Sequence, residues 1–148
     1  MKAISLWQPW ASLWCSGIKI CETRHWPTKH VGWLVVHAAK RIEHEHPQPL
    51  MDILDGEFGK HWGLDLPRGA IVGRVRLIGC QPTAEIYYST SRAFKNEADQ
   101  DDFYCGDFTP GRFAWRAQTF ETFKEPIPYR GAQGFFEVPD AILPKLTA

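Results

Sequence analysis

The segment Gly69–Cys80 places the strongest constraint on the fold, because its side chains alternate with the two-residue period of a β-strand. Apolar side chains and one glycine occupy one set of alternate positions: Ile71, Gly73, Val75 and Leu77. Arg74 and Arg76 occupy the other set, which predicts a strand with one face against a core. Since a strand of this kind is not stable alone, the chain is expected to build a β-sheet around it.

Shorter apolar runs supply the partner strands and alternate with short helical segments. Strands are expected at 3–6, 20–24, 33–38, 113–123 and 134–138. The run Trp33–Ala38 is almost entirely apolar, which is typical of a strand buried on both faces. A helix is expected at 10–15, ended by Gly17, and a weaker one at 49–62, where two glycines interrupt the pattern. This order predicts an α+β fold, a small mixed β-barrel of about five to six strands with short flanking helices.

The chain contains no internal repeat, low-complexity tract or linker, so residues 1–148 are expected to form a single domain. Its apolar runs are too short to cross a bilayer and its first residues do not resemble a signal peptide, which predicts a cytoplasmic protein without membrane contact. The cysteines form no C-x-x-C pair: Cys15, Cys21, Cys80 and Cys105. They are expected to be reduced, and neither a metal nor a cofactor is predicted.

The charges of the chain cancel overall but are unevenly distributed. Seventeen Lys and Arg residues balance 17 Asp and Glu residues, which argues against a protein that coats long nucleic acids by charge alone. Residues 1–50 carry six Lys and Arg against three Asp and Glu, whereas residues 85–107 carry two against six. A polyanion is therefore expected to meet the N-terminal half. The aromatic content of 14%, with seven tryptophans, indicates rings that could stack on bases.

Several motifs occur in the order of a known family. They are S-L-W-Q-P-W-A at 5–11, G-x-K-x-x-E-x-R at 17–24, L-V-V-H-A-A-K at 34–40, G-A-I-V-G at 69–73, F-A-W at 113–115 and P-Y-R-G-A-Q-G-F at 128–135. On these motifs the chain resembles the ASCH family of the PUA-like superfamily. The resemblance implies a PUA-like barrel with a cleft beside the first helix, and a role in RNA binding or RNA metabolism. Some members are enzymes: one branch hydrolyses N4-acetylcytidine, and others have been assigned ribonuclease activity.

The G-x-K-x-x-E-x-R motif supplies the main candidate site residues, Lys19, Glu22 and Arg24. Lys19 follows the helix-ending glycine, so its ammonium is expected at the cleft rim, where it could bind phosphate or, if desolvated, act as a base. Glu22 and Arg24 are two residues apart and therefore share one face of a strand. A carboxylate accepts from a base amino group, and a guanidinium clamps a phosphate or a base carbonyl. We expect the three side chains to converge on one pocket; an exposed ion pair is the purely structural alternative.

Five further residues are candidates for a nucleic-acid site. Trp26, at the end of the motif strand, and Trp115, near two arginines, are expected to stack on bases. His37 and Lys40 follow the buried strand, where polar side chains can line a pocket. Gln133 lies in a glycine-bounded turn and could offer its amide to a base edge. Packing is the structural alternative for the rings and for His37.

These observations favour a module that binds RNA or a nucleotide, with Lys19, Glu22 and Arg24 as a polar floor between aromatic walls. The sequence does not distinguish RNA from DNA. The first alternative is a hydrolase, a ribonuclease or an N4-acetylcytidine amidohydrolase, with the same three residues as catalytic groups. In the amidohydrolase branch a lysine is the base and a threonine three residues later is the nucleophile. Lys19 matches the lysine, but Glu22 stands at the threonine position, and Thr23 is expected to point to the opposite face.

The second alternative is a protein-interaction adaptor whose contact is the acidic segment 85–107. This segment lies within residues 82–111, the least regular part of the chain, which is expected to form a helix and a mobile loop over a cleft. The sequence identifies no particular protein partner.

Overall fold

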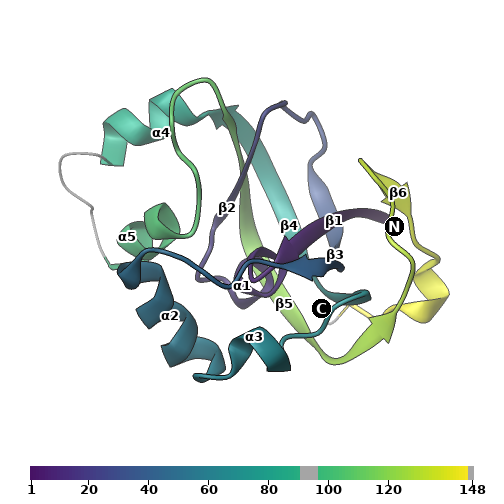
Figure 1. Cartoon of the computed structure of the whole chain (residues 1–148). Helices are drawn as coiled ribbons and strands as arrows, with labels where there is room; N and C mark the ends of the chain where they lie inside the picture. Colours follow the sequence, from purple (N-terminus) through teal and green to yellow (C-terminus); the bar gives the residue numbers. More distant parts are fainter. Residues whose placement is uncertain (91–96, 147–148) are drawn as a thin grey trace.

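A computed structural model describes residues 1–90 and 97–146, which form one strongly curved sheet with short helices around it (Figure 1). The strands are β1 (Lys2–Gln8), β2 (Cys21–Arg24), β3 (Gly32–Ile42), β4 (Ala70–Pro82), β5 (Phe113–Pro128) and β6 (Phe136–Glu137). They follow the order β2-β5-β4-β3-β1-β6, and every neighbouring pair is antiparallel except β1 with β3. The predicted α+β class and strand number are confirmed. The sheet curls like a barrel but is not closed, because no ladder joins β2 to β6 within the described residues.

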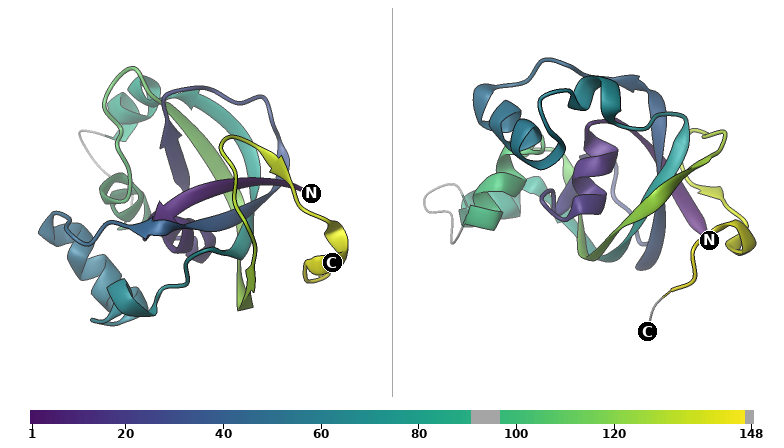
Figure 2. Two further views of the ribbon diagram at one scale, coloured as in Figure 1. Left: turned by 45° about the vertical axis from the view of Figure 1, so that its right-hand side comes forward. Right: turned by 90° about the horizontal axis from the view of Figure 1, so that it is seen from below.

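Most helices gather on one side of the sheet or inside its curl, whereas the C-terminal 3₁₀ helix lies near β6 and the N-terminus (Figure 1). They are α1 (Trp10–Ser16), α2 (Gln48–Phe58), α3 (Trp62–Asp65), α4 (Thr83–Thr90), α5 (Glu97–Tyr104) and the 3₁₀ helix η1 (Asp140–Ile142). Helix α1 lies within the curl and contacts β1, β3, β4 and β5 (Figure 2). The segment 82–111 thus forms two helices rather than one. The mobile loop predicted there falls partly on residues 91–96, which lie outside the described residues.

Helix α1 begins and ends where the sequence predicts. The side chain of Gln8 is fully buried, and its Oε1 accepts a hydrogen bond from the backbone N–H of Ser12 at 3.0 Å. Gly17 ends the helix in the left-handed region, with φ of 84°, which only glycine adopts at little cost. This turn directs the chain back toward the sheet, so that β2 begins four residues after Gly17.

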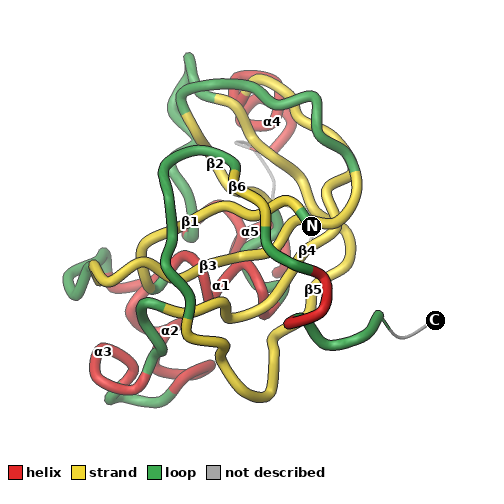
Figure 3. Tube along the Cα trace, turned by 90° about the vertical axis from the view of Figure 1, so that its right-hand side faces the viewer, coloured by secondary structure: helices red, strands yellow, loops and turns green. Residues whose placement is uncertain are grey.

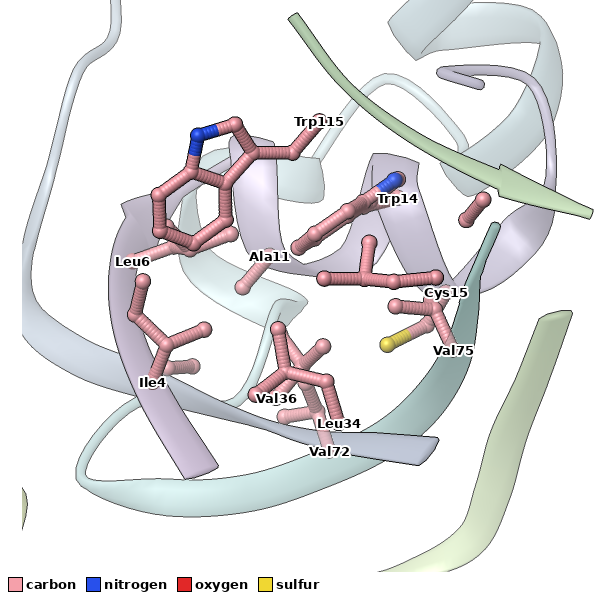
Figure 4. Close-up of a cluster of buried hydrophobic side chains, with 13 residues drawn as sticks. Ile4, Leu6, Ala11, Trp14, Cys15, Leu34, Val36, Val72, Val75 and Trp115 are labelled. Atoms are coloured by element: carbon pink, nitrogen blue, oxygen red, sulfur yellow. The ribbon is translucent and has the colours of Figure 1, made fainter. Parts of the chain in front are cut away.

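The main core lies between α1 and the concave face of the sheet (Figure 4). Its side chains come from β1, α1, β3, β4 and β5: Ile4, Leu6, Ala11, Trp14, Cys15, Leu34, Val36, Ala38, Val72, Val75, Leu77, Trp115 and Ala117. Trp14 and Trp115 are both completely buried. Because interiors are close-packed, this core fixes the positions of the strands whose outer side chains form the site described below.

Strand β4 departs from the simple alternation that the sequence indicates. An irregularity in the pairing with β5 lies between Ile71 and Gly73, and a bulge of this kind changes the face on which later side chains lie. Val75 packs in the main core, whereas Ile71 packs in a second cluster with Val35. The expectation that Ile71 and Val75 share a face is therefore wrong.

Arg74 is buried rather than solvated, with 1% of its surface exposed. Its Nε donates to Glu121 at 2.6 Å, and its Nη1 donates to the backbone carbonyl of Pro144 at 2.8 Å. The guanidinium therefore holds the segment after η1 against the sheet. This role is structural, since the carboxylate and the carbonyl groups occupy its donors.

A buried carboxylate joins α5 to the motif strand β2. Asp102 Oδ1 accepts hydrogen bonds from the backbone N–H groups of Ile20 at 2.6 Å and Cys21 at 2.9 Å. Burial raises the pKa of the Asp102 carboxyl, although these two hydrogen bonds act in the opposite direction. The acidic helix α5 thus contributes to the position of the G-x-K-x-x-E-x-R motif.

Candidate nucleic-acid interface

Three adjoining pockets form one groove along the rim of the curved sheet. The large pocket, about 1260 Å³, lies between the loop 128–134 and the ends of β1 and β3. The middle pocket, about 330 Å³, lies between β1 and β2, and the end pocket, about 470 Å³, lies between β2, α2 and the residues that follow α5. Adjacent pockets share lining residues, so the groove is continuous. The large and middle pockets share Ser5, Trp7, Arg24 and Trp26, and the middle and end pockets share Trp10, Glu22, Thr23 and Arg112.

Arg24 lies at the end of β2, where the large and middle pockets meet. Its guanidinium carbon is 4.4 Å from the ring centroid of Trp26 and 5.7 Å from that of Trp115. Its Nε is buried and has no hydrogen-bond partner, and no other buried side-chain nitrogen or oxygen of the described residues lacks one. Burial lowers the pKa of this guanidinium, with Glu22 opposing the shift and Arg112 adding to it. Arg24 is therefore a half-buried cation with an unused donor.

Lys19 and Glu22 form a buried ion pair in the end pocket. Lys19 Nζ donates to Glu22 Oε2, and the two side chains are only 2% and 12% exposed. The ammonium also lies 5.4 Å from the ring centroid of Trp14. Its position follows from the turn after Gly17, where the backbone N–H of Lys19 donates to Leu13 O at 3.3 Å.

The three motif side chains lie along one groove but do not line a single pocket. Lys19 and Glu22 both line the end pocket, and Glu22 and Arg24 both line the middle pocket. Glu22 is therefore the shared neighbour, as expected for positions two apart on a strand. Thr23 is also buried and lines the middle and end pockets, although it was expected to face away from Glu22.

His37 is 3% exposed and makes two hydrogen bonds at the floor of the large pocket. Its Nδ1 is 2.8 Å from Ser5 Oγ, and its Nε2 is 2.7 Å from the carbonyl oxygen of Tyr129. The loop between β5 and β6 crosses in front of β1 and β3 in Figure 3, and its residue Gly131 lies close to Ser5 and His37. A Cβ at Gly131 would lie 2.7 Å from His37 Nδ1, so only glycine fits there. His37 therefore joins β1, β3 and the loop; the sequence suggested the pocket but not this role, and it did not single out Ser5.

Trp26 and Trp7 supply the exposed aromatic surface of the groove, with 45% and 42% of their surfaces accessible. The guanidinium of Arg41 lies 4.0 Å from the ring centroid of Trp7. Trp7 was not among the stacking candidates named from the sequence. The alternation along β1 contained the signal, because Ile4 and Leu6 point into the core and the next side chain must point outward.

Trp115 has no accessible surface and belongs to the main core. Its Nε1 donates to the backbone carbonyl of Trp26 at 3.1 Å. The expected stacking surface on Trp115 is therefore absent, because its ring points into the curl of the sheet. Instead this ring packs behind Trp26, with the two centroids 6.4 Å apart.

The charges of the groove change from one end to the other. Arg24, Lys40 and Arg130 line the large pocket, and no Asp or Glu is among its lining residues. Gln133 is exposed and lines the same pocket. The end pocket instead contains both signs: Lys19 and Arg112 with Glu22, Glu43 and Asp107. The large pocket is thus the part of the groove that favours an anion.

No group of three or more potential metal-binding side chains (His, Cys, Asp or Glu) occurs among residues 1–90 and 97–146. The cysteine thiols Cys15, Cys21 and Cys105 are buried, and burial raises the pKa of each. A protonated, buried thiol is a poor nucleophile, so the groove's chemistry rests on its nitrogen and oxygen groups.

The motif order and the groove on one rim of the sheet agree with the family comparison, in which a model of the ASCH domain matches residues 4–126. The chain belongs to the ASCH family. The match includes Lys19, Glu22 and Arg24 but ends before the loop 128–134. ASCH domains are associated with RNA binding.

One curated protein and several crystal structures are similar to this ASCH domain. The human protein "Activating signal cointegrator 1" is 38% identical over 84 residues, a match that spans 52% of this chain and only 14% of that protein. The crystal structure of ASCH from Zymomonas mobilis superposes with a TM-score of 0.55 at 15% identity, covering 95% of this chain and 88% of that one. A mutant of the same bacterial protein gives a TM-score of 0.53, also at 15% identity, and covers 93% of this chain and 89% of its own.

At this level of identity the bacterial structures bear on the fold alone, and they agree with the curved mixed sheet and short helices described above. Among residues 1–90 and 97–146, no helix has the length and apolar character needed to span a membrane.

Proposed function

We propose that the groove of this ASCH domain binds single-stranded nucleic acid. The observation that carries the proposal is Arg24, a half-buried guanidinium that lines both the large and the middle pocket and lies close to the ring of Trp26. A partly desolvated cation is stabilised by a ligand that supplies negative charge or hydrogen-bond acceptors. A phosphate or a base carbonyl has the acceptor geometry that a guanidinium fork matches.

The surroundings of Arg24 support a ligand that is both anionic and aromatic. Lys40 and Arg130 line the large pocket without a carboxylate, so this end of the groove attracts phosphates. Trp7 and Trp26 expose rings at the boundary of the large and middle pockets. Base stacking on such rings contributes about 1–3 kcal/mol per base and requires bases that are not paired in a duplex.

The remaining candidate residues have distinct roles in this proposal. Glu22 borders the middle pocket and accepts from a base amino group, while Lys19 neutralises its charge from the buried side. Gln133 offers its amide to a base edge from the exposed turn of the loop. His37 positions the floor of the pocket rather than touching the ligand.

The test is binding of a short fluorescent single-stranded RNA, measured by anisotropy over a range of salt concentrations. Contacts from three cations predict a slope of log K against log salt of about −2 for a single strand. Arg24→Ala should weaken binding roughly tenfold or more and make the slope shallower by about 0.7. Arg24→Lys should keep the slope of log K against log salt, because the positive charge stays. It should lose affinity, because lysine lacks the two-pronged hydrogen-bond geometry of the guanidinium.

Arg76→Ala is the matched control. Arg76 is exposed on β4 and lines none of the three pockets, so its removal should leave affinity and slope nearly unchanged. Equal binding by the Arg24→Ala and Arg76→Ala proteins, both shown to be folded, would rule out this site.

An RNA or nucleoside hydrolase is the second candidate, because a buried lysine–carboxylate pair lies beside a guanidinium in the same groove. A base and a cation of this kind could act on a phosphodiester or an amide. Incubation of the purified protein with single-stranded RNA and with N4-acetylcytidine tests this activity. Turnover that disappears in Lys19→Met protein shown to be folded at the assay temperature would support a hydrolase; turnover that persists would arise elsewhere or from contamination.

A further inference from the structure

The hydrogen-bond chain from Tyr129 to Ser5 determines the direction of the Ser5 hydroxyl. His37 Nε2 lies 2.7 Å from the Tyr129 carbonyl oxygen, which can only accept, so Nε2 carries the hydrogen. In the neutral ring the other nitrogen, Nδ1, is then an acceptor. With the ring in this neutral tautomer, Ser5 Oγ, 2.8 Å from Nδ1, donates its hydrogen to His37. Toward the groove Ser5 presents only lone pairs.

Ser5 faces the groove because of its place on β1. Its neighbours Ile4 and Leu6 point into the main core, so Ser5 points to the opposite side, as Trp7 does. Ser5 is partly exposed and lines both the large and the middle pocket. The loop residue Gly131 packs closely against both Ser5 and His37, which holds the pair in place.

This acceptor lies in a pocket whose charged groups are all donors. Arg24, Lys40 and Arg130 carry only N–H groups at their ends, and no carboxylate lines the large pocket. A ligand that satisfies the whole pocket therefore has two properties. It is anionic, to bind the cations, and it offers a neutral hydrogen-bond donor close to its anionic groups. A cationic donor such as an amine is disfavoured by the three positive charges.

We infer that Ser5 Oγ accepts a hydrogen bond from a ribose 2′-hydroxyl, and that this contact selects RNA over DNA. The inference rests on the proposed binding of a single strand in this groove. In RNA the 2′-hydroxyl is a neutral donor directly beside a backbone phosphate, whereas DNA has no donor at that position. Ser5 thus acts as a specificity-determining residue, and His37 acts through it as a positioning residue.

A series of 2′-substituted strands tests this contact in the unmodified protein. Short strands of one sequence carry 2′-hydroxyl, 2′-amino, 2′-deoxy, 2′-fluoro or 2′-O-methyl sugars, first throughout and then at single positions. Only the hydroxyl and the neutral amino group can donate. We expect the 2′-hydroxyl and 2′-amino strands to bind about three- to tenfold more tightly than the 2′-deoxy, 2′-fluoro and 2′-O-methyl strands. This is the change in affinity that one ordinary hydrogen bond contributes. One position of the strand should account for most of the difference.

Ser5→Ala removes the acceptor and should abolish the preference, so that the ratio of RNA affinity to DNA affinity falls to about one. Ser16→Ala is the matched control, since the Ser16 hydroxyl donates to Leu13 O within α1 and lines none of the three pockets. Circular dichroism and thermal unfolding establish that each variant is folded.

The outcomes separate this inference from the proposed function. Equal binding of all five strands by the unmodified protein overturns the inference and leaves single-strand binding in place, with the donor to Ser5 then a base N–H. A preference for RNA that persists in folded Ser5→Ala protein also overturns it. Absence of binding to any strand overturns the proposed function itself. The strand series alone decides the question if Ser5→Ala protein does not fold.

Discussion

The buried pair of Lys19 and Glu22 allows a quantitative test of how the motif serves the fold. Lys19→Met keeps the length of the side chain but removes its charge, leaving the Glu22 carboxylate, only 12% exposed, without its cation. Breaking one partner of a buried pair typically costs about 3–5 kcal/mol, because the remaining charge is desolvated and unpaired. For a domain of this size each kcal/mol lowers the unfolding temperature by about 2–4 °C, so a decrease of about 6–20 °C is expected.

The measurement is urea unfolding monitored by circular dichroism. The slope of the free energy of unfolding against urea concentration is compared with that of the unmodified protein. Adding Glu22→Gln to Lys19→Met should recover more than half of the lost free energy of unfolding, because the neutral amide needs no counter-charge. Lys124→Met is the control, since Lys124 is exposed on β5 and its change should stay within about 0.5 kcal/mol. A loss below about 1 kcal/mol in Lys19→Met protein would show that the pair is not held in a low-dielectric site, and that Lys19 is solvated as a surface lysine.

Three further predictions concern the groove floor, the motif strand and the C-terminal segment. Gly131→Ala places a methyl group within 2.7 Å of His37 Nδ1, so the free energy of unfolding in urea should fall by about 1–3 kcal/mol. The amides of the loop 128–134 should then exchange hydrogen faster, and unchanged exchange would contradict the close packing. Burial makes the Asp102 carboxyl harder to ionise in the folded chain, so its folded-state pKa is raised. The protonated carboxyl therefore contributes stability at acid pH, and this contribution is lost as the pH rises through the folded-state pKa. Asp102→Asn should therefore unfold at higher urea than the unmodified protein near about pH 7, with little difference near about pH 3, and the opposite order would refute the assigned shift. Arg74→Met removes the donor to the Pro144 carbonyl and the ion pair with Glu121, so limited proteolysis should cut the C-terminal segment faster. Because the Glu121 side chain is 36% exposed and can be solvated, the stability loss should be about 1–3 kcal/mol.

Local patterns were sufficient to predict most elements of the fold. The helix α1 follows from an apolar segment closed by Gly17, and β3 follows from an apolar run of strand length. The interruption of the second helical segment near Gly59 also agrees with the structure, where α2 ends at Phe58 and α3 begins at Trp62. These features depend on neighbouring residues only, so the sequence contains them directly.

The face of β4 could not be predicted in the same way. The bulge near Gly73 arises from the pairing of β4 with β5, a partner about fifty residues later in the chain. A Cβ at Gly73 would meet the side chain of Cys15 at 2.7 Å, so the glycine permits α1 to approach the sheet. Neither contact leaves a signal in the alternation of β4 alone.

By itself the sequence determined the family, the order of helices and strands, and the placement of Lys19 after the helix-ending glycine with Glu22 and Arg24 two apart on the next strand. Short-range chemistry and ordered motifs carry that information. Only the tertiary structure decided which polar groups remain available. It buried Trp115, paired Lys19 with Glu22 and left Arg24 Nε without a partner. It also brought the Tyr129 carbonyl to His37, 92 residues away along the chain, and so directed the hydroxyl of Ser5. Hydrogen-bond satisfaction depends on every group within about 3 Å, and those groups come from strands that only folding brings together.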